Sequence, residues 1–190
     1  MLTILLIRAG TTEYDCQGRI QGTLDVPLSE VGRRQAEAAA DELVEKSASI
    51  AALYAGPCLS AQETAEILAE RLKLKPKTLS KLHNLNQGLW QGMLFDDVKN
   101  KQPKVYRQWH DHPETVCPPE GETLAAAGER FKKALAKLIK KHKSGTIGLV
   151  LAQPLAGVAR SLMRAEQLPS VCQSQCDSKP LWEPIDVAAE

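Results

Sequence analysis

Short apolar runs alternate with longer segments of helical periodicity along most of this chain. The run Leu2–Arg8 has the length and composition of a buried strand, and so have Ile50–Tyr54 and Thr146–Ala152. Strands that alternate with helices favour an α/β fold in which helices cover both faces of the sheet. We therefore predict a three-layer sandwich with a mostly parallel central sheet.

The segments between these runs carry the helix signals. Ser29 is an N-cap candidate with Glu30 in the first turn. The residues expected to line the apolar face of this helix are Val31, Ala36, Ala39 and Leu43. Prolines and glycines make residues 82–122 rich in loops. The other expected helices are Cys58–Leu72, Phe95–Lys99, Pro103–Trp109, Thr123–Lys143 with Gly145 ending it, and Pro154–Arg164.

Length and composition restrict the class of protein. With 190 residues, the chain 1–190 is expected to form a single domain. A net charge of +1 and an aromatic content of 4% argue against a nucleic-acid partner. The N-terminal apolar run is too short for a signal peptide or a membrane span, so we expect a cytoplasmic protein without membrane contact.

The cysteines with the C-terminal tail, and the lysine-rich stretch, are given structural rather than functional interpretations. Five cysteines at irregular spacing indicate free thiols, and no role is assigned to Cys172, Cys176 or the tail 169–190, which is expected to be irregular. The stretch Lys132–Lys143 has its lysines mostly off the apolar stripe. It is interpreted as a solvated helix face, with an anion-binding surface as the alternative.

In α/β sheets of this kind, sites form in the crevice at the carboxyl ends of the strands. Arg8 and Ala9 end the first predicted strand, whereas Ala152 and Gln153 end the last clear one. We therefore expect these four residues to meet at one edge of the sheet.

Several short motifs resemble the histidine phosphatase (phosphoglycerate mutase-like) superfamily. The first is Leu6-Ile7-Arg8-Ala9-Gly10-Thr11-Thr12, and the resemblance extends from Leu2 to Arg160. It implies a phosphoglycerate mutase-like fold and an activity of phosphomonoester hydrolysis or phosphoryl transfer. The other similar segments are Gly18–Gly22, Asp25–Leu28, Gly32 with Gln35 and Ala36, Thr64–Leu68, Gly88–Gly92 and Pro119–Thr123.

The resemblance also implies that four reactive positions differ in this chain. Arg8 matches the family's first arginine, but Ala9 stands where a histidine attacks phosphorus, and alanine has no lone pair to offer. Ser60 stands where a second arginine clamps the phosphoryl group, and Asn84 where an acid protonates the leaving group. Gln153 stands where a second histidine is expected, and it cannot carry charge.

Few other side chains could replace this chemistry. His83, His110 and His112 are interpreted as polar loop residues, because two ligands without a third partner rarely bind a metal tightly. Cys16 would need positive surroundings to become a reactive thiolate. We therefore expect no metal and no cofactor.

The leading hypothesis is a catalytically inactive pseudoenzyme that serves as a binding or scaffolding protein for an unidentified protein partner. The alternatives are a residual phosphomonoesterase or phosphoglycerate mutase-type enzyme, and a module that binds a small anionic or neutral ligand.

The expected pocket is nearly neutral, with Glu13 or Glu122 close to its arginine. Structural roles remain open for Arg8 as the partner of a carboxylate, and for Arg19, Gln21 and Trp90 as loop anchors. The candidate ligand-binding residues are Arg8, Arg19, Ser60, Asn84 and Gln153.

Overall fold

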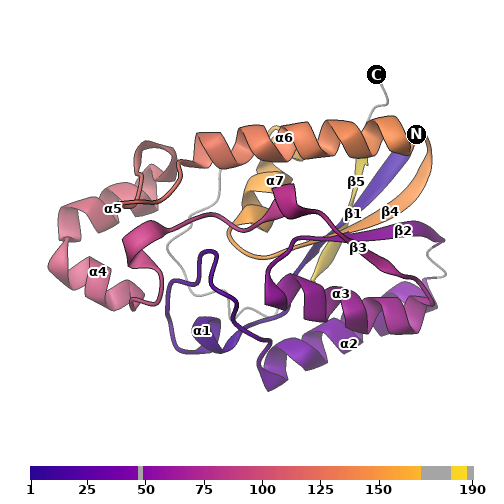
Figure 1. The fold of residues 1–190 in the computed structure, drawn as a ribbon, viewed down its shortest axis with the longest axis horizontal. Coiled ribbons are helices and arrows are strands. Elements are labelled where there is room, and N and C mark those ends of the chain that lie inside the picture. The colour runs from indigo at the N-terminus through magenta and orange to yellow at the C-terminus, as the bar shows by residue number, and fades with distance from the viewer. Residues whose placement is uncertain (47–48, 168–180, 188–190) are drawn as a thin grey trace.

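Five strands form one sheet in the order β3-β2-β4-β1-β5 in this computed structural model, which describes residues 1–46, 49–167 and 181–187 (Figure 1). Strands β1, β2, β3 and β4 run parallel to one another, and the edge strand β5 runs antiparallel to β1. The predicted α/β fold with a mostly parallel sheet is confirmed. The strands are β1 (Leu2–Arg8), β2 (Ile50–Ala55), β3 (Pro76–Thr78), β4 (Gly145–Leu151) and β5 (Trp182–Val187).

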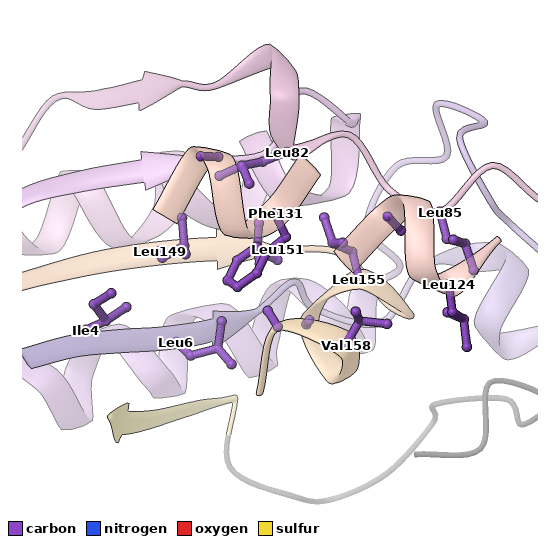
Figure 2. Packing of buried hydrophobic residues seen from close by; sticks show 14 of the residues in the cluster. Ile4, Leu6, Leu82, Leu85, Leu124, Phe131, Leu149, Leu151, Leu155 and Val158 are labelled. Atoms are coloured by element: carbon purple, nitrogen blue, oxygen red, sulfur yellow. The ribbon is translucent and has the colours of Figure 1, made fainter. Parts of the chain in front are cut away.

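Helices cover both faces of the sheet, with α2 and α3 on one side and α6 and α7 on the other (Figure 1). Successive side chains of β1 alternate between the two layers. Ile4 and Leu6 belong to the core under α6 and α7 (Figure 2), whereas Leu5 and Ile7 pack with α2 and α3. The helices are α1 (Glu13–Cys16), α2 (Glu30–Glu45), α3 (Leu59–Leu72), α4 (Phe95–Lys101), α5 (Pro103–Asp111), α6 (Leu124–Lys141) and α7 (Leu155–Arg164), with the 3-10 turns η1 (Ser80–Leu82), η2 (Gly88–Trp90) and η3 (Pro113–Thr115).

The predicted N-cap of α2 is confirmed. The Ser29 side chain accepts a hydrogen bond from the amide of Gly32, as an N-cap should. Val31, however, is 44% exposed, so its predicted place in the core is wrong. The contact face of α2 is rotated toward Gly32, where an added Cβ would lie 2.0 Å from the carbonyl oxygen of Thr11. Glycine therefore allows α2 to lie directly against the loop after β1.

The prediction that Gly145 ends a helix is also wrong. Helix α6 stops at Lys141 with His142 as its C-cap, and Gly145 already begins β4 with φ of +91°. Glycine adopts this backbone conformation without steric cost, so the chain turns sharply into the strand.

The tail is not irregular throughout. Trp182–Val187 form β5, with Ile185 buried against β1 opposite Ile4. Pro184 hid this strand from sequence analysis, although proline is tolerated in an edge strand. Cys172 and Cys176 lie outside the described residues, and no helix among the described residues is long and apolar enough to span a bilayer.

Candidate functional site

A small pocket lies where β1 and β4 end. Arg8 pairs in register with Leu151, so the residues that follow both strands meet at one edge of the sheet. The four residues expected there do lie together and line this pocket, which is open to solvent. The lining residues are Arg8, Ala9, Gly10, Thr11, Thr12, Asp15, Gln21, Ser60, Ala152 and Gln153.

Three of the five candidate ligand-binding residues line this pocket, namely Arg8, Ser60 and Gln153. Ser60 is fully buried in the first turn of α3, whereas Arg8 and Gln153 are half-buried. The other two candidates, Asn84 and Arg19, are not among the lining residues.

Arg19 is engaged in a loop contact. Its Nε donates to the side-chain oxygen of Gln17 at 2.9 Å, and its Nη1 donates to the carbonyl oxygen of Gly92 at 2.7 Å. The guanidinium thus joins the loop after α1 to the segment before α4. This geometry matches the loop-anchor alternative.

The amide of Asn84 joins three backbone segments behind the pocket, and the residue is 1% exposed. Its Nδ2 donates to the carbonyl oxygens of Gly22 at 2.8 Å and Gln153 at 2.5 Å. Its Oδ1 accepts from the amide of Leu155 at 3.2 Å, which satisfies a donor at the start of α7. A carboxylate could accept here but not donate, so this bonding pattern requires an amide.

Four backbone amides that follow β1 beside the pocket have protein partners. An anion could bind to any of them only by breaking an existing hydrogen bond, which costs free energy when the displaced acceptor is buried. The Ala9 amide donates to Leu151 O (2.8 Å), Gly10 to Thr64 Oγ1 (3.0 Å), Thr11 to Gln35 Oε1 (3.0 Å) and Thr12 to Asp15 Oδ2 (2.8 Å).

The start of α7 offers no spare donors either. Besides the Leu155 amide, the Ala156 amide donates to the carbonyl oxygen of Ala152 at 3.0 Å. The Gly157 amide donates to the side-chain oxygen of Gln153 at 3.3 Å. Gln153 therefore caps this helix with its Oε1 while it lines the pocket.

The pocket contains one cation and one carboxylate, Arg8 and Asp15, so its formal charge is balanced. The expected carboxylates were Glu13 and Glu122, and neither lines the pocket. Glu122 is instead paired with Arg130 at 2.7 Å. Sequence analysis missed Asp15, although the capping box that it forms with Thr12 at the start of α1 was a readable signal.

Phosphate is expected to bind this pocket with a dissociation constant of about 1 mM or weaker, equivalent to roughly 4 kcal/mol at most. The Asp15 carboxylate repels the anion, and the amides of Gly10, Thr11 and Thr12 are already bonded. Isothermal titration with inorganic phosphate measures this constant. Micromolar binding that is lost in Arg8→Ala would contradict the expected weakness.

The remaining candidates lie apart from the pocket. His110 contacts Asp111 at 2.9 Å, and His112 contacts Glu114 at 3.5 Å, all on the surface. Cys16 is exposed in α1 and does not line the pocket. Within the described part of the chain, no group of three or more histidine, cysteine or acidic side chains could hold a metal ion.

Cys58, the N-cap of α3, lies 3.9 Å from the Ser60 hydroxyl, and burial raises the pKa of its thiol. At pH 7.5 we expect iodoacetamide to alkylate the exposed Cys16 and Cys117 but not Cys58, because the reagent needs an accessible thiolate. Peptide mapping by mass spectrometry distinguishes the sites. Equal labelling of Cys58 in the folded protein would show that this region opens readily.

Comparison with known proteins links the chain to one family. A model described as histidine phosphatase superfamily (branch 1) matches residues 4–167. Phosphoserine phosphatase 1 of Hydrogenobacter thermophilus is 33% identical over 150 residues, which cover 79% of this chain and 70% of that protein. Phosphoglycerate mutase-like protein 4 of Arabidopsis thaliana is 33% identical over 161 residues, covering 84% and 68% respectively. Among solved structures, Bacillus stearothermophilus YhfR has a TM-score of 0.86 at 23% identity, with 98% of this chain and 92% of that chain covered.

Proposed function

This chain belongs to the histidine phosphatase superfamily, and within that family we propose that it is a catalytically inactive member kept for binding or scaffolding. The observation that carries the proposal is Ala9, which lines the pocket at the end of β1 directly after Arg8. A methyl group cannot form a bond to phosphorus, so covalent transfer through this position is excluded.

The bonding around the pocket supports the proposal. Asn84, the expected position of the acid, is committed to two carbonyl groups and one amide. Gln153 caps α7 with its side-chain oxygen. Both residues thus have structural contacts that a titrating acid or a charged imidazole would not reproduce. The pocket combines these contacts with a balanced charge, which is a poor environment for a phosphoryl dianion.

The purified protein is expected to hydrolyse p-nitrophenyl phosphate, and to convert phosphoglycerate, no faster than a no-enzyme blank. The reason is the missing nucleophile, with Ser60 in place of a charged clamp. Initial rates over a range of substrate concentrations provide the measurement. Pocket variants serve as the control, because the activity of a contaminating phosphatase would be the same in every variant. Saturable turnover that vanishes in Arg8→Ala would instead support the residual phosphomonoesterase.

A binding module for a small polar ligand is the second candidate. Hydroxyl and amide groups from Thr11, Ser60 and Gln153 line the pocket beside its opposite charges. A ligand that binds only the folded state stabilises it by RT ln(1 + L/Kd), where L is the free ligand concentration, and so raises the melting temperature. A thermal-shift screen of small neutral and anionic compounds therefore tests this candidate. Shifts that disappear in Arg8→Ala would favour it over scaffolding alone.

A further inference from the structure

Exposed lysines from two distant parts of the sequence lie on neighbouring elements, one part running from the end of α3 through β3 to η1 and the other along the second half of α6, against which η1 packs. Residues 73–81 and 132–143 contain no aspartate or glutamate. Strand β3 lies at one edge of the sheet, and all three of its residues are exposed. We define the lysine surface as the exposed residues Lys73, Lys75, Lys77, Lys81, Lys137, Lys140, Lys141 and Lys143.

Contacts around Tyr54 bring the two segments together. Tyr54 of β2 pairs in register with Lys77 of β3, and its hydroxyl lies 2.8 Å from Nε2 of His142 at the end of α6. The Lys141 ammonium lies 5.5 Å from the centroid of the Tyr54 ring. Desolvation lowers the pKa of His142, and the nearby charges of Lys141 and Lys77 lower it further, which is consistent with this proximity.

The lysine surface lacks compensating charge. Among the described residues, none of its eight lysines forms an ion pair, whereas the neighbouring Arg71 and Lys132 pair with Asp41 and Glu129. The whole chain has 24 basic and 23 acidic residues. Because eight lysines belong to the lysine surface, the rest of the chain carries more acidic than basic side chains. Lys137 and Lys141, four residues apart on α6, also repel each other.

Ordinary structural roles explain only part of this surface. Lys140 and Lys141 interact favourably with the carboxyl end of the α6 dipole. Lys77 protects the edge strand from pairing with other chains. Neither role applies to Lys81 in η1 or to Lys137, which lies a full turn before the end of α6.

We propose that the lysine surface docks an extended acidic segment of a partner protein. Lysine presents a hydrated point charge on a flexible stem, so a row of lysines accommodates carboxylates at variable spacing. The docking does not involve the pocket, and the proposal goes beyond the inactive-enzyme function.

The same observations disfavour the other polyanionic partners. Single-stranded nucleic acid is usually held by stacking on aromatic rings, and residues 73–81 and 132–143 contain no tryptophan, tyrosine or phenylalanine. Stable attachment to an anionic bilayer needs a second, apolar anchor. Of the large hydrophobic side chains that are exposed in the described residues, Val31, Val44 and Leu89 lie outside the two segments, and Met1, whose carbonyl oxygen accepts from the Gly145 amide near the end of α6, is a single apolar side chain.

Fluorescence anisotropy with a labelled twelve-residue polyglutamate peptide tests the proposal on the full chain. We expect saturable binding at 50 mM NaCl that weakens by about tenfold at 300 mM NaCl, since screening shortens the range of exposed charges. The quadruple variant Lys77→Gln, Lys81→Gln, Lys137→Gln, Lys141→Gln should lose at least about tenfold in affinity, because it removes half of the charge of the surface.

The matched control removes the same net charge from α4 and α5, through Lys99→Gln, Lys101→Gln, Lys104→Gln and Arg107→Gln, all of which are exposed. It should retain the wild-type affinity within about twofold. Absence of saturable binding, or an equal loss in both quadruple variants, would overturn the proposal. Tighter binding to a twelve-nucleotide single-stranded RNA or to phosphatidylserine vesicles than to the peptide would also overturn it, because either result assigns the surface to another class of partner.

Discussion

Ala9→His alone is expected to leave the turnover of an aryl phosphate at least about a thousandfold below that of an ordinary enzyme, which corresponds to roughly 4 kcal/mol of barrier. The new imidazole would supply a nucleophile, but one cation, Arg8, would face the phosphoryl dianion beside the Asp15 carboxylate. Transferring phosphoryl groups are stabilised by several preorganised donors, and here the backbone amides of Gly10, Thr11 and Thr12 are already bonded.

The size of the deficit follows from the groups that remain absent. Loss of a single oxyanion donor costs about 10²–10³ in rate, and Ser60 and Gln153 each stand where a charged donor is expected. A missing general acid, with Asn84 in its place, costs about 10²–10⁴. Groups that act as a unit do not add, so a thousandfold is a lower bound rather than a product.

Initial rates with p-nitrophenyl phosphate measure this result. The double variant that carries both Ala9→His and Arg8→Ala is the control for contaminating activity. The melting temperature of each variant shows whether the protein remains folded. Turnover within about tenfold of an ordinary enzyme would mean that the pocket stabilises the transition state without the second arginine and histidine, contrary to the bonding described for it.

The main strands and helices could be predicted from the sequence because the patterns that encode them are local. Strands β1 and β4 are continuous apolar runs, α2 begins after the Ser29 cap that the sequence suggested, and α6 begins next to Thr123, where its start was predicted. Strand β3 was missed because its three exposed residues show no apolar alternation. Strand β5 was missed because its pairing with β1 joins residues about 180 positions apart, and no local pattern encodes such a contact.

The candidate site was predictable in its position but not in its bonding. The rule that strand ends meet placed Arg8 and Gln153 correctly. It could not show that Asn84 bonds three backbone groups, or that Arg19 is held by the carbonyl oxygen of Gly92. Those contacts depend on the path of loops, which composition alone does not determine.

Asn84→Asp is expected to lower the free energy of unfolding by about 3 kcal/mol at pH 7, because a buried carboxylate would face two carbonyl oxygens that have lost their donor. Burial should raise the pKa of the new carboxyl in the folded state. A raised folded pKa gives stability that is present below the unfolded value of about 3.9 and is lost as pH rises, so the deficit should shrink near pH 4. Urea denaturation at pH 7 and pH 4 measures both effects.

Asn86→Asp is the matched control, because it makes the same chemical change two residues away at a half-buried side chain. The Oδ1 of Asn86 accepts from the Gly88 amide at 2.9 Å, an interaction that a carboxylate can also make, so its loss should stay below about 1 kcal/mol. Equal and small losses in both variants would show that the Asn84 amide is dispensable. An acid could then occupy the position at little cost, and the residual-enzyme alternative would gain support. A large loss of stability confined to Asn84→Asp would mean that an acid at position 84 is incompatible with the way this chain folds.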